Sequence, residues 1–447
     1  MSDVTILQVV PRLETGGSEQ STVEIAAALT QAGAKALVAT EGGRLATALE
    51  AAGGEIIALP VASKNPLTIL ANARHLARIV EDRNVTLLHA RSRAPAWSAY
   101  LAARRTGRPF VTTYHGAYSG RSRLKTFYNS VMAHGDRVIA NSRFTAGLIN
   151  GQYTVPPEHL HVIYRGFDVS AFEAATVAPE RIARLREAWG IAPGQRVVLQ
   201  AARLTRWKGH SHTIEAARLL KERDQLGDAV VVFAGDTQGR EDYRAELQAE
   251  IDSADLTGIV RLVGHCDDIP AAFTLADIAV VASTRAETFG RTSIESQAAG
   301  CPVIVSDVGA ASENVVTQRD GDDFTGWVVP TADAQALAGC LAEALTLSPA
   351  ALAAIGERAR THARARFALH DMQRATLAVY DELLGTALGA SFSQSKQLYS
   401  FKKSCAGCGP FCPDFAPVSP RHPGISVSCP RYAATRAGNQ HPKRVVK

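Results

Sequence analysis

Short apolar runs of strand length alternate with helix-length stretches along most of the chain, and this alternation limits the fold more than any other feature. A strand-like run at 4–10 is followed by a glycine turn and by a helical pattern that ends near Gly33. Further strand-like runs occupy 36–40, 55–59, 86–90, 109–114 and 137–141. Alternation of this kind is typical of a parallel sheet covered by helices on both faces. We therefore expect residues 1–168 to form one doubly wound α/β domain.

The alternation pauses and then restarts, which indicates a second domain. Residues 151–195 contain four prolines and one helical stretch, and we interpret 169–195 as a linker. Strand-like runs resume at 196–203, 229–235, 259–264, 278–283 and 302–307. We expect a second doubly wound domain over 196–365 and a C-terminal helix over 366–387, with a helix break near Phe367. A chain of 447 residues suits two such domains.

The last part of the chain, 388–447, has a different composition. It contains nine Lys/Arg, one Asp and seven Pro and shows no hydrophobic periodicity, so we expect it to be a disordered tail. The remaining residues contain 39 basic and 42 acidic side chains, which gives the folded part a net charge near −3. A nucleic-acid-binding protein would need a basic folded face, so the balance of charge argues against that class.

Two sequence patterns contain residue types that bind metals, but neither predicts a metal site. Tail cysteines 405, 408, 412 and 429 lack the two matched pairs and the packed element between them that are typical of zinc sites. Asp320 and Asp322 have the spacing of an acidic metal-binding motif, yet Gly321 and charged neighbours indicate a surface turn.

The rest of the chain reads as an intracellular protein. Cys266, Cys301 and Cys340 stand singly inside apolar patterns, so we expect reduced, buried thiols. No stretch reaches the roughly 18 uncharged apolar residues that a membrane-spanning helix needs. The N-terminus carries an acidic residue and runs directly into a strand, unlike a secretory signal. We therefore expect a cytoplasmic protein.

Glu287 and Glu295 frame the motif that carries most chemistry. The motif follows the strand-like run at 278–283, which predicts that Glu287 lies in a strand-to-helix loop and Glu295 inside a short helix that begins near Gly290. The free backbone N–H groups at such a helix start form a ready site for pyrophosphate. Loops at the carboxyl ends of parallel strands are also where open α/β sheets bind ligands.

Two further loops follow strands in the same way. Arg203 and Lys208 come directly after the run at 196–203, and cations suit the charge that a nucleoside diphosphate gains as it leaves. Gly16 and Gly17 follow the first strand and permit a tight turn, after which Ser18 is expected to cap the next helix.

Taken together, these motifs resemble those of the retaining glycosyltransferases of family 4. The likeness consists of the two glutamates eight positions apart, the Arg203–Lys208 segment upstream of them and the N-terminal Gly-Gly loop. IYRGFD at 163–168 resembles the interdomain segment of that family, although Tyr164 and Arg165 replace its usual Pro-Asn. The likeness covers about 4–384 and leaves out the tail.

The resemblance implies a GT-B fold, in which two Rossmann-like domains face a cleft and the C-terminal helix packs back on the first domain. It further implies that Arg203 and Lys208 bind the donor pyrophosphate, that Glu287 contacts the transferred sugar and that Glu295 holds the ribose. The resemblance also places backbone or side-chain contacts to the substrates at four more positions, Gly16, Gly17, Phe289 and Gly290, and puts His115 beside the sugar and the acceptor. Transfer with retention of configuration and without a metal ion is implied as well.

The opening of the chain looks most like bacterial mannosyltransferases of the lipopolysaccharide core. That likeness favours GDP-mannose as donor, with a UDP-sugar as the alternative, and a glycan or lipid-linked acceptor. The segment 121–128 joins three cations to two aromatic side chains and suits peripheral contact with the anionic inner membrane, or equally a solvated helix face.

Other functions remain possible on the same fold. A nucleotide-sugar epimerase or a phosphorylase-like enzyme would use the same donor site, and a non-catalytic nucleotide-sugar-binding protein would keep only the site. A glycoside hydrolase is a poor alternative, because its two carboxyl groups must face each other across the bond, whereas Glu287 and Glu295 are predicted on a loop and on the helix behind it.

Overall fold

The computed structural model describes residues 4–14, 16–116, 118, 122–173, 176–318 and 323–395. The predicted disordered tail lies outside the described residues from position 396 on. The tail cysteines and the pair Asp320 and Asp322 lie outside them too.

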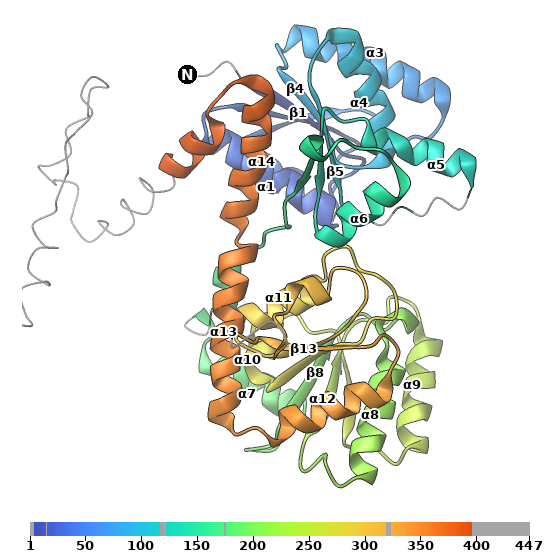
Figure 1. The fold of residues 1–447 in the computed structure, drawn as a ribbon, viewed down its shortest axis with the longest axis vertical. Helices are drawn as coiled ribbons and strands as arrows, with labels where there is room; N and C mark the ends of the chain where they lie inside the picture. The colour runs from blue at the N-terminus through green and yellow to red at the C-terminus, as the bar shows by residue number, and fades with distance from the viewer. Residues whose placement is uncertain are drawn as a thin grey trace, which may run out of the picture. The chain divides into compact units, whose positions relative to one another are not determined.

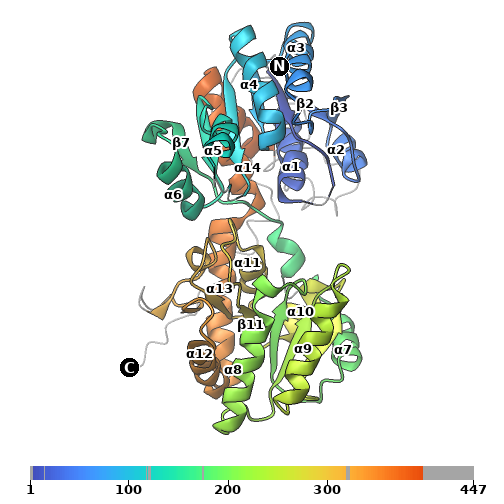
Figure 2. The same ribbon diagram turned by 90° about the vertical axis from the view of Figure 1, so that its right-hand side faces the viewer.

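Two wholly parallel sheets organise the described chain. The seven-stranded sheet has the order β3-β2-β1-β4-β5-β6-β7 and the six-stranded sheet the order β10-β9-β8-β11-β12-β13. Helices cover both faces of each sheet (Figures 1 and 2), and we call each sheet with its helices the N-terminal and the C-terminal lobe. The prediction of two doubly wound α/β domains is confirmed.

The strands of the first sheet are Thr5–Val9, Lys35–Thr40, Gly54–Ala58, Leu87–Ala90, Phe110–Tyr114, Arg137–Ala140 and Leu160–Val162, in chain order β1 to β7. Those of the second are Val197–Ala201, Val230–Ala234, Val260–Gly264, Ile278–Val281, Val303–Ser306 and Gly326–Val329, in chain order β8 to β13.

The helices follow the strands in the order expected for crossover connections. In the N-terminal lobe they are α1 (Gly17–Gln31), α2 (Ala46–Ala51), α3 (Pro66–Asp82), α4 (Arg93–Thr106), α5 (Arg123–Ser130) and α6 (Arg143–Gln152). The later helices are α7 (Pro179–Ala188), α8 (His210–Glu222), α9 (Glu241–Ser253), α10 (Ile269–Leu275), α11 (Arg291–Ala298), α12 (Ala334–Thr346), α13 (Pro349–Phe367) and α14 (Leu369–Leu384). Strand order reverses between β1 and β4 and again between β8 and β11, and these switch points are where such sheets bind ligands.

The C-terminal helices join the two lobes. The predicted break near Phe367 is confirmed, because α13 ends at Phe367 and α14 begins at Leu369. α14 packs on α1, and Leu377 and Tyr380 lie fully buried in the core of the N-terminal lobe. The Tyr380 hydroxyl also lies 2.6 Å from Nδ1 of His89 on β4. The expected return of the C-terminal helix onto the first domain is therefore confirmed.

The structure differs from the sequence-based expectations at four places. Residues 388–395, expected to belong to the disordered tail, are helical instead, and Leu388 and Phe392 lie buried in the core of the N-terminal lobe. β7 and β13, the last strand at one edge of each sheet, were not predicted as strands; β7 has no fully buried residue and so lacks a continuous apolar run. Ser18 does not cap α1; the cap position is Gly16, which has no side chain, and Ser18 is already helical. Within 169–195, Phe172, Trp189 and Ile191 pack into the core of the C-terminal lobe.

The three cysteines of the folded part are free, as predicted. Cys266 and Cys301 are buried and Cys340 is half-buried. Burial raises the pKa of all three thiols, that of Cys340 to about 11, which makes them unreactive. Among the described helices, none is by itself both long and apolar enough to cross a membrane; α12 and α13 meet that test only as a pair bent by 113°.

Candidate active site

Two loops at the switch point of the C-terminal lobe carry the charged site residues. Arg203 and Lys208 follow β8, and Glu287 follows β11, the neighbouring strand of the sheet. The backbone N–H of Thr284 donates to the carbonyl oxygen of Trp207 at 2.7 Å, which ties the two loops together. The side chains predicted from separate motifs are therefore brought to one edge of one sheet.

Lys208 and Glu287 form a direct ion pair. The Lys208 Nζ lies 2.7 Å from Oε1 of Glu287, and the two side chains are 10% and 19% exposed. Ser283 Oγ donates to the same carboxylate oxygen at 2.6 Å. On the other side, Gln200 Nε2 donates to the Lys208 carbonyl oxygen at 2.8 Å. Both charged groups are thus held in place before any substrate binds.

Gly209 allows the loops to approach this closely. Its φ is +74°, and a Cβ at this position would lie 1.9 Å from the carbonyl oxygen of Ala282 at the end of β11. Any other residue would push the loop after β8 away from Glu287 and would strain the backbone. The glycine that follows Lys208 is therefore part of the site geometry.

A cavity of about 630 Å³ opens beside this ion pair. Its volume is within the range of small-molecule sites. The C-terminal lobe contributes Arg203, Trp207, Glu287 and the start of α11, while the N-terminal lobe contributes Gly17, Ser18, His115, Gly116, Asn141 and Arg165. Of the predicted site residues, Arg203, Glu287, Phe289, Gly290, Gly17 and His115 line this cavity.

Three predicted residues do not line the cavity: Lys208, which contacts its lining residue Glu287, and Gly16 and Glu295. Gly16 caps α1 next to Gly17, and Glu295 lies one turn into α11. Arg291 Nε lies 2.5 Å from Oε1 of Glu295. Burial raises the pKa of Glu295, and the Arg291 charge opposes that shift. Phe289 is mostly core, since its side chain packs on Phe367 with ring centroids 6.1 Å apart.

His115 faces the cavity from the N-terminal lobe. It follows β5, and its carbonyl oxygen accepts a hydrogen bond from Thr288 Oγ1 at 3.1 Å. Burial and the charges of Arg91 and Arg165 hold the pKa of His115 well below its usual value. The imidazole is therefore neutral near pH 7, and its buried Nε2 has no hydrogen-bond partner within the described part of the chain. Such a ring is ready to bind a substrate hydroxyl.

Sequence reasoning did not assign several residues that line the cavity, among them Asn141, Arg165 and Trp207. Arg165 lies against Gly17 so closely that a Cβ on the glycine would be 2.4 Å from its Nη1. Burial lowers the pKa of Arg165, and the charges of Glu24 and Glu295 oppose this. The available signal was Arg165 itself, which stands where the family pattern has Asn.

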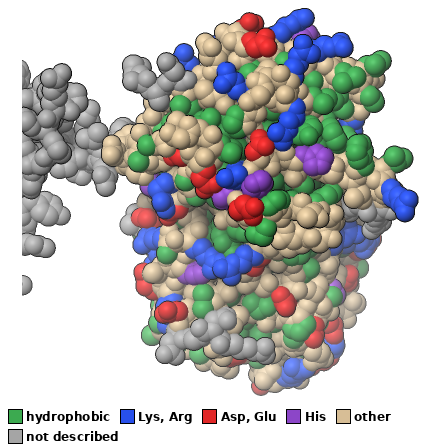
Figure 3. Space-filling view, turned by 45° about the horizontal axis from the view of Figure 1, so that its top comes forward, with side chains coloured by type: hydrophobic (Ala, Val, Ile, Leu, Met, Phe, Trp, Pro, Cys, Tyr) green, Lys and Arg blue, Asp and Glu red, His purple; other side chains and the backbone are tan. Residues whose placement is uncertain are grey.

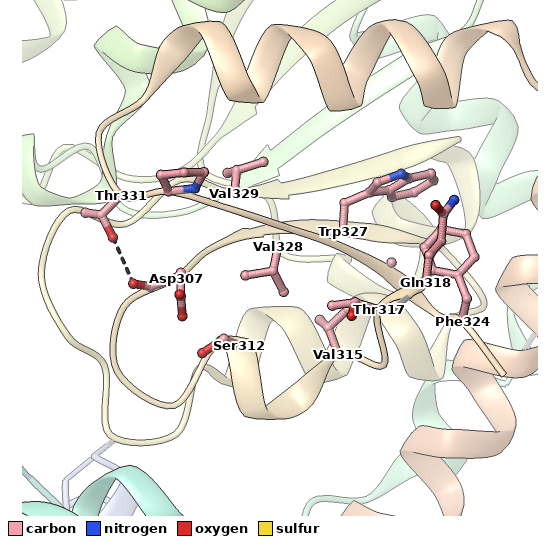
Figure 4. Close-up of a pocket in the computed structure, with 12 residues that line it drawn as sticks. Asp307, Ser312, Val315, Thr317, Gln318, Phe324, Trp327, Val328, Val329 and Thr331 are labelled. Carbon is pink, nitrogen blue, oxygen red and sulfur yellow. Dashed lines mark hydrogen bonds between the residues drawn. The ribbon is translucent and has the colours of Figure 1, made fainter. Parts of the chain in front are cut away.

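A second cavity, of about 680 Å³, lies along β13 and reaches the carboxyl end of β12 (Figure 4). Thr331 Oγ1 donates to the Asp307 carbonyl oxygen at its rim. Asp307 is the only charged side chain among its described lining residues, so the cavity offers no cation to a diphosphate. The cavity beside Lys208 is therefore the candidate active site.

Acid is expected to destabilise the lobe that carries the ion pair through His210, the first residue of α8. Burial lowers the pKa of His210 to about 4. Between pH 6.5 and 4 the unfolded chain takes up a proton at this side chain that the folded chain refuses, so stability falls as the pH falls. The loss reaches about 3 kcal/mol at pH 4. Denaturant unfolding at several pH values should show a shallower loss for His210→Gln, whereas His265→Gln, at an exposed histidine, should follow the wild-type curve.

Family models match both lobes. Residues 181–362 match the model described as glycosyl transferases group 1, and residues 15–171 match that of glycosyltransferase family 4. The chain is 31% identical over 269 residues to the lipopolysaccharide core biosynthesis mannosyltransferase LpcC of Rhizobium leguminosarum, covering 60% of this chain and 70% of that protein. It is 30% identical over 271 residues to a D-inositol 3-phosphate glycosyltransferase of Jonesia denitrificans. That match covers 56% of this chain and only 60% of the relative's length.

Solved structures give the same result. A glycosyltransferase from Rickettsia africae is 34% identical with a TM-score of 0.78, and the match covers 87% of this chain and 100% of that one. HepE of Anabaena, solved in complex with UDP-glucose, is 24% identical with a TM-score of 0.68 over 85% of this chain and 100% of that one, and it supports the fold alone. The family models, the identity to LpcC and the shared fold agree with the motifs, and the chain belongs to glycosyltransferase family 4.

Proposed function

We propose that this protein transfers a sugar from a nucleotide-sugar donor to an acceptor hydroxyl with retention of configuration. The observation that carries the proposal is the Lys208–Glu287 pair, whose carboxylate lines a cavity together with Arg203 and, from the other lobe, His115. Two cations and one carboxylate match a donor whose diphosphate and sugar lie next to each other.

The chemistry assigns a role to each group. The bond between the anomeric carbon and the diphosphate oxygen breaks, and Arg203 and Lys208 stabilise the negative charge that forms on the leaving phosphate. The acceptor oxygen bonds to the same face of the anomeric carbon, and its proton passes to the leaving phosphate. Glu287 accepts hydrogen bonds from the transferred sugar, and neutral His115 contacts a sugar or acceptor hydroxyl. Glu295, close to the start of α11, holds the ribose of the donor.

For the donor and the acceptor we propose GDP-mannose and a lipopolysaccharide core glycan, at the cytoplasmic face of the inner membrane. The support is the 31% identity to LpcC together with the likeness of the opening residues to mannosyltransferases. A phosphorylated cyclitol acceptor is the second candidate. It is favoured by the Jonesia relative and by Arg165, a cation on the N-terminal side of the cavity for which the described residues provide no hydrogen bond.

Nucleotide binding is the first test. We expect GDP-mannose and GDP to raise the melting temperature of the full chain without added metal, by several degrees at a hundredfold excess over Kd. Stabilisation by UDP-sugars alone would be consistent with glycosyl transfer but would rule out GDP-mannose as the donor. If no nucleotide stabilises the protein, the donor site is wrongly assigned.

Transfer to an acceptor separates the remaining functions. Incubation of the stabilising donor with truncated lipopolysaccharide cores, or with inositol 3-phosphate, should yield a glycosylated product and free nucleotide. An epimerase would convert the free donor without any acceptor, and a sensor would bind the donor unchanged.

A further inference from the structure

The outer half of the N-terminal lobe is strongly basic. Residues 55–136 contain twelve Lys/Arg and four acidic residues, so this segment has a net charge of +8, with Glu55 and Asp136 paired to Arg83 and Arg104. The whole chain has a net charge of +5. The positive charge of the folded part is therefore concentrated on one segment, which includes α3, α4 and α5.

The same helices carry the exposed apolar side chains. Among the described residues, five large hydrophobic side chains are exposed. Four of them lie on two helices: Leu67 and Leu70 on α3 are 77% and 48% exposed, and Leu124 and Phe127 on α5 are 83% and 66% exposed. Exposed apolar groups that gather in one region are typical of an interaction site.

α4 connects the two exposed groups into one surface. Ser98 Oγ on α4 donates to the Ile69 carbonyl oxygen on α3 at 3.1 Å. Trp97, the preceding residue, packs on Phe127 with ring centroids 5.4 Å apart and donates to the Tyr128 carbonyl oxygen at 3.0 Å. The first two turns of α3 and α4 therefore lie together, with α5 beside them (Figure 1). Figure 3 shows hydrophobic and basic side chains together on the side where α5 lies.

We propose that this surface, formed by α3 and α5 on either side of α4, binds peripherally to an anionic lipid bilayer. Leucine and phenylalanine side chains enter the boundary between headgroups and acyl chains, while Lys64 and Arg123 face anionic headgroups. A second copy of this chain fits poorly, because it would bring the same positive charge against itself. Nucleic acid would use the basic groups and leave the apolar side chains exposed to water.

The surface lies on the side of the lobe that supports catalysis. The first turns of helices that follow parallel strands lie at the carboxyl edge of the sheet, where β5 ends and His115 faces the cavity. A membrane-borne acceptor would thereby reach the active site without leaving the bilayer. Only this last step depends on the proposed function; lipid binding is measured without donor or acceptor.

Co-sedimentation of the full chain with lipid vesicles tests the proposal. We expect binding to phosphatidylcholine vesicles that contain about a third phosphatidylglycerol, weak binding to phosphatidylcholine alone, and a loss of binding as salt rises. Leu124→Ser/Phe127→Ser should lower the partition coefficient about 100-fold, and Lys64→Gln/Arg123→Gln about 30-fold. All four side chains are exposed, so the variants should keep the wild-type melting temperature.

Matched controls separate this surface from the rest of the chain. Val162→Ser changes the fifth exposed hydrophobic side chain, and Arg240→Gln/Arg244→Gln removes two exposed cations at α9 in the other lobe. Both controls should bind like wild type, and every variant keeps the basic tail. Unchanged binding in the α5 variant would overturn the proposal, as would equal binding to neutral vesicles. If only the charge variant Lys64→Gln/Arg123→Gln loses vesicle binding, the protein binds by surface charge without inserting apolar side chains. That result would also overturn the proposal.

Discussion

Glu287→Gln is expected to lower the turnover number by about 100- to 1000-fold. The carboxylate is 19% exposed and is oriented by Lys208 at 2.7 Å and by Ser283 at 2.6 Å, so it presents a charged acceptor at a fixed place. Glutamine keeps the shape but turns one oxygen into a donor that faces the lysine. Losing an electrostatic contact that acts in the transition state costs a factor of this size.

Steady-state kinetics with the donor that stabilises the protein would measure the effect. The melting temperature should fall as well, because Lys208, which is 10% exposed, loses its counter-ion, so turnover is measured at a temperature where the variant is folded. Ser283→Ala is the matched control: it removes one hydrogen bond to Glu287 and leaves the charge, so its loss should be about tenfold. Near-wild-type turnover in Glu287→Gln would show that this carboxylate does not contact the reacting sugar.

Lys208→Ala is expected to lower both turnover and stability. The ammonium group is the closest cation to Glu287, and its loss removes a contact to the leaving diphosphate. A fall in kcat/KM of about 1000-fold is expected when a cation at a developing negative charge is lost. Because Glu287 would remain mostly buried without its partner, the unfolding free energy should fall by about 3 kcal/mol.

A double-mutant cycle separates the two effects. Lys208→Ala/Glu287→Gln removes both charges, so it should recover most of the lost stability while activity stays low. Chemical denaturation and donor-dependent kinetics on the same four proteins would provide both readouts. A double variant as unstable as Lys208→Ala would mean that the lysine supports the fold through its packing on Trp207 and not through the ion pair.

Most of the strands could be placed along the sequence because the central strands are buried on both faces. β1 and β9, for example, are buried at every position, and a continuous apolar run of five residues marks such strands clearly. β7 has no fully buried residue, so its sequence lacks that mark. The strands that were not predicted, β7 and β13, lie at sheet edges, where their position depends on pairing with the neighbouring strand.

The candidate site was predicted in pieces. Glu287 and Lys208 were each assigned from a motif after a strand, since parallel strands bring such loops to one edge. The 2.7 Å contact between them spans 79 positions of sequence and follows from the adjacency of β8 and β11. Arg165 shows the opposite case: nothing in its neighbours along the chain places it against Gly17, because that contact arises only once the first sheet has formed.

Local sequence determined the type of most elements, the break between α13 and α14, and the loops that hold charged side chains. These features depend on hydrophobic period, on glycine and on proline, which act within a few residues. Tertiary structure alone decided which charges pair, that His115 is neutral, and that the apolar side chains of α3 and α5 lie on either side of α4. Burial, the local electrostatic field and the neighbours of a side chain depend on distances through space, and folding sets these between residues far apart in the chain.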